Sequence, residues 1–400
     1  MPAVASIAAV KQAARLRGLA FLVVIACGAL SLSESAIGSE GAADEASRGR
    51  IIRTRRIAPG LLYTRIVQKG IPRRTFVLEM DPSRRVTLDV TLAEAAMPAR
   101  RPLSRIVAAH DALAGVNGDY SGNGDPFHAL AQDGHLLQTS ERVSFQFALS
   151  ADESRSFVDV VTPRIHLTNT DSGATIRIRT WNDGSLQLGE LVGYSPLGGT
   201  LEVPPRFACS VRLLPRGGPT IASGDGVNRE FVVDEVGCSA APMPREGGVV
   251  VATPPATDEA TEMLALTRRT RMRLHWTYGW PGVLDSVGGF PLLVRDGRLV
   301  GICRHGCGTQ PRTAVGVKRN GDVLLVVVDG RRPGWSRGVS MSQFARLMRD
   351  LGADTALNLD GGGSSEMVVD GEVVNKPSDG RERHISNAIL VLPGPDPGEG

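Results

Sequence analysis

The residues best suited to chemistry stand together near the end of the chain. An apolar strand pattern runs into residues 358–365, Asn-Leu-Asp-Gly-Gly-Gly-Ser-Ser, and Met367-Val368-Val369 then resumes as a strand. The three glycines remove side chains next to Asp360, so bare backbone can approach a ligand there. The stretch presents one carboxylate, backbone amides and two hydroxyls, which suits a nucleophile or general base beside a bound anion.

Two other kinds of site do not fit this stretch. A phosphate loop requires a lysine after its glycines, and none follows here. A serine-hydrolase elbow requires a closing glycine, whereas Gly362-Gly363-Ser364-Ser365-Glu366 ends in glutamate. Asp360 is therefore the expected reactive group.

A second polar stretch runs from Asn117 to Asp125 and alternates oxygen-bearing side chains with glycine or tyrosine. The spacing is similar to the first half of a calcium loop, with Asp119 and Asp125 as weak ligand candidates. Position 12 counted from Asp119 is Leu130, where such a loop needs glutamate. We therefore expect no cofactor, with calcium as the alternative, and a polar turn with side-chain to backbone hydrogen bonds competes with any site role.

Three further segments could contribute. Arg312 begins a strand, where its guanidinium could be a surface charge or could grip a phosphate or carboxylate. Asp329 ends the apolar run Val326-Val327-Val328, and with Gly330 it could simply turn the chain. A charged loop from Lys376 ends abruptly at Ser386-Asn387 against an apolar strand, which places those two side chains at the edge of the core.

The elements that must position these residues are mostly strands. Hairpin signals stand between apolar segments at Asp133-Gly134, Asp183-Gly184, Asp296-Gly297, Asn320-Gly321 and Asp370-Gly371. Strands at residues 61–67, 75–80 and 86–90 predict a meander, and a further strand is expected over 272–276.

Three helices are predicted. They cover residues 104–113 with Ser104 as N-cap and Gly115 as stop, residues 258–268 after Thr257, and residues 340–351, where Ser340 and Gln343 form a capping box before Gly352. Residues 241–257 are expected to be a surface loop. Helices this few and scattered favour an α+β class of hairpin-rich, mostly antiparallel sheets over alternating βαβ units.

The N-terminus predicts export. Lys11, Arg15 and Arg17 precede an apolar run over residues 18–32, as in a secretory signal, and the run is short for a membrane span. Processing after Ala36-Ile37-Gly38 competes with lipidation of Cys27, so the protein is expected in the periplasm or outside the cell, with a lipid anchor as the alternative. Residues 1–50 form signal and leader, 51–392 one domain, and 393–400 a disordered tail.

The net charge and the number of cysteines bear on the partners of the protein and on its disulfides. Loss of residues 1–27 removes three cations and no acid, so the formal charge of +3 falls to zero, which argues against a nucleic-acid partner. Four cysteines then remain, and local bridges of Cys209 with Cys238 and Cys303 with Cys307 are the favoured pairing of three. A zinc site at Cys303 and Cys307 with His305 is weaker because no second close pair exists.

Taken in order, these motifs resemble the phosphodiester glycosidase family. The resemblance spans about residues 60–392 and rests on Val116-Asn117-Gly118, Tyr194-Ser195-Pro196, Gly199-Thr200, Gly288-Gly289, Pro291-Leu292, Asp296-Gly297, Pro311-Arg312-Thr313-Ala314, Val328-Asp329-Gly330, residues 358–365, Asn375, Pro377-Ser378-Asp379 and Ser386-Asn387-Ala388. Two departures add acid near the expected site. Asp119 stands where the family commonly has glycine, and Glu366 where a small residue or threonine is usual.

The resemblance implies an enzyme that splits a sugar-1-phosphodiester at the anomeric C–O bond. Asp360 would be the nucleophile or base, Asp329 a second carboxylate, Asn117 and Asn358 would position sugar hydroxyls, and Arg312 and Arg383 would hold the phosphate. The remaining expected substrate contacts are Gly361, Gly362, Gly363, Ser364, Ser365, Thr313, Ser386 and Asn387. Asp360, Arg312 and Asn117 are expected to meet in one cleft.

Two functions from different classes remain open at this point. The first is a secreted hydrolase acting on sugar phosphodiesters of envelope or capsular glycans. The second is a non-catalytic envelope protein that binds anionic or phosphorylated glycans in the same place, because a shared fold does not establish chemistry.

Overall fold

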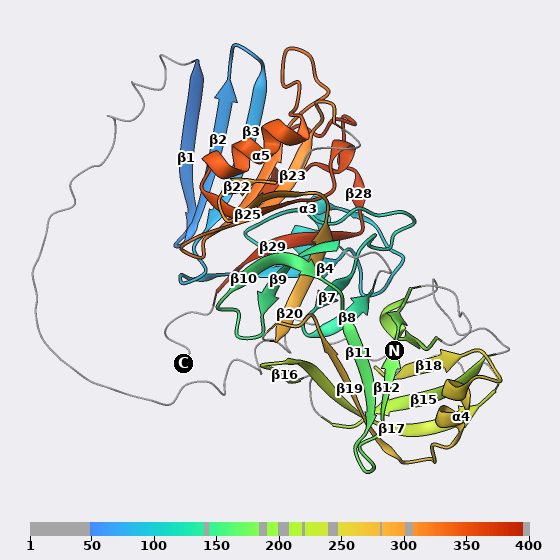
Figure 1. Ribbon diagram of the computed structural model, residues 1–400. Coiled ribbons are helices and arrows are strands. Elements are labelled where there is room, and N and C mark those ends of the chain that lie inside the picture. Colours follow the sequence, from blue (N-terminus) through green and yellow to red (C-terminus); the bar gives the residue numbers. More distant parts are fainter. Residues whose placement is uncertain are drawn as a thin grey trace, which may run out of the picture.

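The computed structural model shows a mostly β protein (Figure 1). It describes residues 49–139, 144–183, 190–198, 208–217, 221–238, 247–280, 282–300 and 307–394. Strands hold 51% of these residues and helices 10%, so the predicted α+β class is wrong. The physical reason is that the sheets bury their apolar faces largely against each other, and the short helices cover only small areas.

The sheets of the upper lobe in Figure 1 hold the segments of interest. One eight-stranded sheet has the order β1 (Arg50–Ala58), β2 (Leu61–Gln68), β3 (Arg73–Met80), β24 (Val323–Val328), β23 (Arg312–Lys318), β25 (Ala353–Asn358), β21 (Leu292–Arg295) and β22 (Arg298–Leu299). A five-stranded sheet has the order β27 (Glu372–Val373), β26 (Met367–Val369), β6 (Ala114–Asn117), β29 (Asn387–Pro393) and β4 (Val86–Leu92).

The middle and the lower lobe are built from two further sheets. The first has the order β10 (Ser156–Val161), β9 (Ser144–Ser150), β20 (Val283–Gly289), β7 (Leu130–Gln132) and β8 (His135–Gln138). The second contains β12 (Thr175–Ile178), β11 (Arg164–Asn169), β19 (Arg271–Thr277), β17 (Gly226–Gly237), β15 (Cys209–Pro215), β18 (Val249–Thr253), β14 (Val192–Tyr194) and β13 (Thr180–Trp181), with β16 (Ile221–Ser223) on β17. A small pair joins β28 (His384–Ile385) to β5 (Arg101–Pro102).

Four of the five predicted hairpins are present. The Asp-Gly or Asn-Gly pairs join β7 to β8, β21 to β22, β23 to β24 and β26 to β27, all antiparallel. Asp133, Asp296 and Asp370 adopt positive φ, as these tight turns require. Gly184 of the remaining pair lies outside the described residues.

Two strand expectations need correction. The meander ends at β3, because β4 leaves for the other sheet and pairs with β29. The expected surface loop over 241–257 contains β18, whose five residues are all buried between β14 and β15. An apolar run buried on both faces carries no polar alternation, so its sequence did not show the strand period.

The helices occur close to where the pattern predicts them. The helix α5 (Met341–Asp350) has the predicted capping box and buries Phe344 and Met348 on the eight-stranded sheet. The helix α4 (Asp258–Leu264) is capped by Thr257 as predicted. The helix α3 (Leu103–Ala109) begins one residue early, with Pro102 rather than Ser104 at the N-cap.

Correspondingly, the Ser104 hydroxyl donates to Glu382 Oε2 over 2.7 Å instead of capping the helix. The predicted stop, Gly115, lies in β6.

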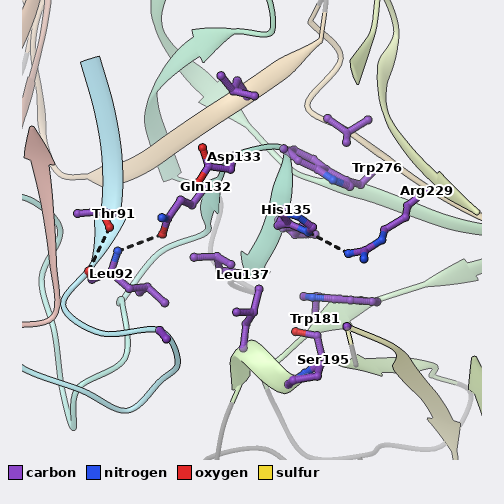
Figure 2. Close-up of a pocket in the computed structure, with 18 of the residues that line it drawn as sticks. Thr91, Leu92, Gln132, Asp133, His135, Leu137, Trp181, Ser195, Arg229 and Trp276 are labelled. Atoms are coloured by element: carbon purple, nitrogen blue, oxygen red, sulfur yellow. Dashed lines mark hydrogen bonds between the residues drawn. The ribbon is translucent and has the colours of Figure 1, made fainter. Parts of the chain in front are cut away.

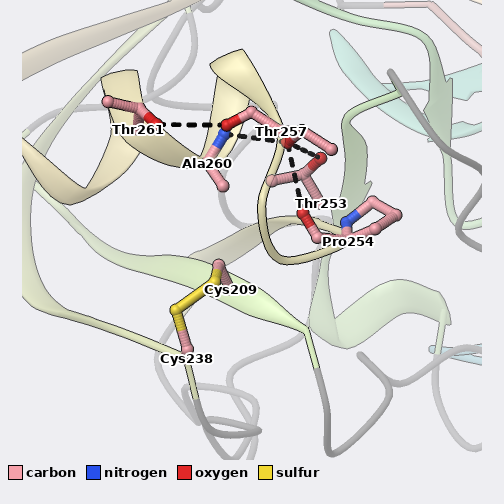
Figure 3. The surroundings of a disulfide bond; sticks show 7 residues. All are labelled: Cys209, Cys238, Thr253, Pro254, Thr257, Ala260 and Thr261. Atoms are coloured by element: carbon pink, nitrogen blue, oxygen red, sulfur yellow. Dashed lines mark hydrogen bonds between the residues drawn. A yellow bond between two sulfur atoms is a disulfide. The ribbon is translucent and has the colours of Figure 1, made fainter.

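The predicted bridge between Cys209 and Cys238 is present and ties β15 to the end of β17 (Figure 3). Cys303 and His305 lie outside the described residues, as do Cys27 and the rest of the predicted export signal. In the part of the chain that is described, no helix combines the length and the apolar character that crossing a bilayer demands.

Candidate functional site

The predicted site residues gather where four strands of the upper lobe begin or end. Residues 359–366, here called the glycine loop, leave β25 of the eight-stranded sheet and enter β26 of the five-stranded sheet. Within these two sheets, Asn358 pairs with Ala314 of β23, and Asn117 at the end of β6 pairs with Ala388 of β29. The loop is therefore the crossing point between the two sheets.

Asn117 holds both ends of the glycine loop through hydrogen bonds. Its amide nitrogen donates to the Asp360 carbonyl over 2.8 Å, and its oxygen accepts from the Thr313 hydroxyl at 2.7 Å and the Glu366 amide at 3.1 Å. Asn117 is also almost completely buried. The structure therefore brings Asn117 to Asp360, as predicted, but directs its amide to protein groups, which is a positioning role.

Asp360 is half-buried and its carboxylate lies within the loop. One oxygen accepts the Gly361 amide at 2.7 Å, while the Asp360 amide donates to the Gly118 carbonyl at 3.0 Å. Burial raises the pKa of Asp360. Hydrogen bonds from Ser364 and Gly361 and the charge of Arg383 lower the pKa, but burial has the larger effect. This carboxylate therefore holds its proton more readily than an exposed aspartate.

Three guanidinium groups border the glycine loop. A Cβ at Gly363 would lie 2.1 Å from Arg383 Nη2, and one at Gly362 would lie 3.1 Å from Arg331 Nη2, so glycine allows both close approaches. Arg312 is buried, and its Cδ would lie 3.9 Å from a Cβ at Gly361. Arg331 was missed from the sequence, although it directly follows Asp329-Gly330.

Each of these guanidiniums also has protein partners. Arg383 donates to Asp379 Oδ2 at 3.0 and 2.6 Å and to the Ser364 hydroxyl at 3.4 Å. Arg312 donates to the Gly308 carbonyl at 3.2 Å, and burial lowers its pKa. Arginine side chains therefore lie next to the loop that carries Asp360, and the charge of Arg383 is shared with Asp379.

The backbone amides contribute less to anion binding than expected. The Gly361 amide bonds Asp360, the Gly362 amide bonds the Pro311 carbonyl at 3.0 Å, and the Ser364 amide bonds the Gly361 carbonyl at 3.2 Å. These three amides already donate to protein oxygens, so in this arrangement they are not open to an anion.

Tyr120 is a second residue that the sequence reasoning did not select. Its hydroxyl donates to the Phe290 carbonyl at 2.9 Å and accepts from the Asn358 amide at 2.8 Å. Burial and the nearby Asp360 carboxylate raise the pKa of Tyr120. Asn358 is fully buried and orients Tyr120, so it does not present its amide to a sugar in this arrangement. The only signal in the sequence was the position of Tyr120 directly after Asn117-Gly118-Asp119.

Asp119 is a buried support rather than an open ligand. Its two oxygens accept from the Tyr120 amide, the His128 amide and His128 Nδ1, each at 2.7 Å. Asn387 Oδ1 accepts the Asp119 amide at 2.7 Å, and Asn387 Nδ2 donates to the Ser386 hydroxyl at 2.8 Å. The predicted pair Ser386 and Asn387 therefore braces the strand end behind the site.

Asp329 occupies a different environment from Asp360. Its carboxylate accepts from Trp335 Nε1 at 2.7 Å, Asn375 Nδ2 at 3.0 Å and the Lys376 amide at 3.1 Å. The pKa of Asp329 is raised, because the effect of burial exceeds the lowering effect of these hydrogen bonds. Asp329 anchors the segments around it, and the second acid that acts on the pKa of Asp360 is Asp119.

Glu366 ends the glycine loop as a buried carboxylic acid. Within the described residues, neither of its side-chain oxygens has a hydrogen-bond partner. Burial, with a smaller contribution from Glu382, raises the pKa of Glu366 to about 8. The extra acid noted in the sequence therefore keeps its proton at pH values at which an exposed glutamate has lost it.

The predicted calcium candidates do not come together as ligands. Asp125 Oδ1 accepts the Asn123 amide at 3.0 Å, and both Asp119 oxygens are engaged. Among the described residues, the group of three potential metal-binding side chains whose ligand atoms all lie within 4.8 Å of one another is Asp89, Asp133 and Asp285, which includes neither calcium candidate.

The arrangement combines a partly buried carboxylate of raised pKa with the guanidiniums of Arg331 and Arg383 against the same loop, and with the side chain of Arg312 next to Gly361. Such a site can bind an anionic group and set a nucleophile or base beside it.

Comparisons with known proteins agree with the family named by the motifs. The family model described as phosphodiester glycosidase matches residues 225–392. Over 82 residues, 20% of this chain, the sequence is 36% identical to the SPbeta prophage-derived uncharacterized protein YomE of Bacillus subtilis, of which 13% is covered. Over 68 residues, 17% of this chain, it is 40% identical to N-acetylglucosamine-1-phosphodiester alpha-N-acetylglucosaminidase of Mus musculus, of which 13% is covered.

The match therefore spans about one eighth of the length of these curated relatives. A crystal structure of a Burkholderia pseudomallei K96243 protein, described as a candidate exported protein, is similar with a TM-score of 0.63 at 21% identity. That similarity covers 86% of this chain and 96% of the other, and at this identity it shows the fold alone.

Proposed function

We propose that this chain, whose residues 225–392 belong to the phosphodiester glycosidase family, is a hydrolase that cleaves the anomeric C–O bond of sugar-1-phosphodiesters. The observation that carries the proposal is the placement of Asp360 in a loop bordered by Arg312, Arg331 and Arg383. Part of the site, including Asn117 and Tyr120, lies outside the matched segment. The geometry of the site therefore supports the proposal in addition to the family match.

In the proposed reaction, the bond between the anomeric carbon and the bridging oxygen breaks, and its electrons leave with the phosphate. Water supplies the new hydroxyl on the sugar carbon and one proton, so the products are a free sugar and a phosphomonoester. Asp360 either attacks the anomeric carbon or removes the proton from water. A phosphate leaves readily as an anion, so the main demand is to hold its charge, which suits the guanidiniums.

The finer proposal is that the protein is exported and acts on envelope or capsular glycans. The N-terminal pattern, the Cys209–Cys238 disulfide and the description of the Burkholderia relative support export. A lipid anchor at Cys27 remains part of this proposal as an alternative form of processing.

The decisive experiment follows isotope from water into products. The purified chain is incubated in ¹⁸O-labelled water with methyl diesters of glucose-1-phosphate and N-acetylglucosamine-1-phosphate. Cleavage of the C–O bond places the label in the sugar, whereas cleavage of the P–O bond places it in the phosphate. We expect the label in the sugar, and label in the phosphate would make the protein a phosphodiesterase instead.

The variant Asp360→Asn tests the assigned residue. It should lower kcat by roughly 10² to 10⁴-fold, the usual contribution of a positioned acid or base. Asp370→Asn is the matched control, because Asp370 is an exposed turn residue that also loses one charge. Binding of such diesters without turnover by either protein, across sugars and both anomers, would favour the glycan-binding alternative.

A further inference from the structure

A second site lies in a cavity between the upper part of the molecule and the lower lobe (Figure 2). Its volume is about 1110 Å³, enough for a ligand of drug-like size. Strands β7 and β8 contribute one wall, and strands β17 and β19 contribute another. None of the described residues that line it belongs to the site around Asp360.

The wall on the lower lobe is the apolar inner face of its curved sheet. Trp181 and Trp276 lie on opposite sides of the space in Figure 2, and Leu137 points into it from β8. Phe231 and Leu274 also line the cavity. A cavity of this kind between β-sheets suits an apolar ligand body.

One charged side chain interrupts this apolar face. In β17, Val227, Arg229 and Phe231 occupy alternate positions and therefore point to the same side of the strand. Val227 and Phe231 are each 1% exposed, and Arg229 pairs across the ladder with Leu274. The strand period thus places a guanidinium at an inward-facing position, where an apolar side chain is the norm.

Arg229 has no acidic partner in the described part of the chain. Its Nη1 contacts His135 Nδ1 at 3.3 Å, its guanidinium lies 5.6 Å from the Phe231 ring, and its buried Nε has no hydrogen-bond partner. No carboxylate among the described residues lies within salt-bridge distance of it. A partly buried cation without a counter-charge costs stability, and a bound anion would offset that cost.

His135 is the neutral member of its pair with Arg229 near pH 7. Burial, together with the charge of Arg229, lowers the pKa of His135 to about 4. Near pH 7 the pair therefore carries a single positive charge on the guanidinium.

Two acids on the remaining walls, Asp152 and Glu94, are engaged by their own neighbours, and the charge of a third, Asp133, acts on His135. Asp152 accepts from the Ser150 hydroxyl at 2.5 Å and the Ser154 amide at 3.1 Å, and Glu94 pairs with Arg101 at 2.6 Å. A ligand would therefore direct its negative end to Arg229 and its apolar part along the tryptophans.

We propose that this cavity binds a single-chain organic anion, with its carboxylate on Arg229 and its alkyl chain packed along Trp181, Trp276 and Leu137. The proposal does not depend on the hydrolase activity, because the two sites share no residue.

Isothermal titration of the full chain with decanoate and with decan-1-ol tests the proposal. Decanoate should bind the wild type at least 10-fold more tightly than the alcohol, because only the acid can pair with Arg229. Arg229→Gln should weaken decanoate binding by about 10-fold or more and should leave decan-1-ol binding unchanged.

The matched control is Arg273→Gln, which removes the same charge from an exposed position on the neighbouring strand. Its affinity for decanoate should equal that of the wild type. Equal binding of both ligands by the wild type, no binding of decanoate, or equal losses in the two variants would overturn the proposal. The ratio of the wild-type affinities for decanoate and decan-1-ol tests the proposal even if Arg229→Gln does not fold.

Discussion

At the scale of single residues, the site depends on close approaches that only glycine permits. Gly362 and Gly363 allow the guanidiniums of Arg331 and Arg383 to lie against the backbone that follows Asp360. Their role is therefore to make room for cations, since several of the loop amides already bond within the protein.

Gly363→Ala should displace Arg383. The new Cβ would lie 2.1 Å from Arg383 Nη2 and 2.3 Å from Asp379 Oδ2, so the guanidinium must move away from the loop. We expect KM for a sugar phosphodiester to rise about 10- to 100-fold through loss of a charged hydrogen bond. Gly70→Ala is the control, because a Cβ there meets no atom within 4 Å. An unchanged KM would remove Arg383 from the phosphate site.

Glu366 should make stability depend on pH. Burial raises its pKa from 4.5 to about 8, so between these values the folded protein holds a proton that the unfolded chain has released. The free energy of unfolding should therefore fall as pH rises from about 5 to 8, by up to about 1.4 kcal/mol per pH unit.

Glu366→Gln should remove this slope, because the neutral amide does not titrate. Urea unfolding at pH 5, 6.5 and 8 measures the effect, with the exposed Glu372→Gln as control. A variant that keeps the wild-type slope would show that another group is responsible.

At the scale of elements, the helix α5 shows how local sequence stabilises the sheet that carries the site. Ser340 Oγ accepts the Gln343 amide at 3.2 Å, and Gln343 Oε1 accepts the Ser340 amide at 2.9 Å. The helix then leads through Gly352, at positive φ, into β25 and the glycine loop. Its cap therefore helps to fix where β25 begins.

Ser340→Ala should lower the free energy of unfolding by about 1 kcal/mol through loss of the N-cap. Ser342→Ala is the matched control, because Ser342 is exposed within the same helix and alanine is the better helix former. Thermal unfolding compares the two variants. Equal stability of both would mean that packing on Phe344 and Met348, rather than the cap, holds the helix.

At the scale of the whole molecule, the two proposed sites belong to different parts of the fold. The Asp360 site joins two sheets of the upper lobe, and the Arg229 cavity is lined in part by β17 and β19. Figure 1 shows β17 and β19 in the lower lobe. The disulfide lies within the lower lobe, between β15 and the end of β17.

Replacing both Cys209 and Cys238 by serine should destabilise the lower lobe. The bridge closes a sequence separation of 29 residues, and losing it should cost about 2–4 kcal/mol. Hydrolysis below the unfolding temperature should be retained, because no described site residue around Asp360 contacts the bridge. Loss of activity in a variant that still melts cooperatively would instead show that the lower lobe supports catalysis. Calorimetry and the hydrolysis assay together distinguish these results.

The sequence by itself determined the local elements and the resemblance to a family. The capping box of α5, the Asp-Gly turns and the N-cap of α4 depend on neighbours a few residues away, so they were readable from the chain. The motif over residues 358–365 likewise indicated the phosphodiester glycosidase resemblance, and the family model matches residues 225–392. The role of Asp360, chosen from the same motif, stays a prediction.

Only the tertiary structure decided what each side chain does. Asn117 bonds the Glu366 amide 249 residues away, Asn358 bonds Tyr120 238 residues away and Asp329 bonds the Lys376 amide 47 residues away. No local pattern reveals such partners. The mostly β class followed from sheets packing on sheets, and the inward Arg229 became evident only when β17 and β19 enclosed a cavity around it. Burial and partner choice are set by contacts between distant segments, which local spacing does not encode.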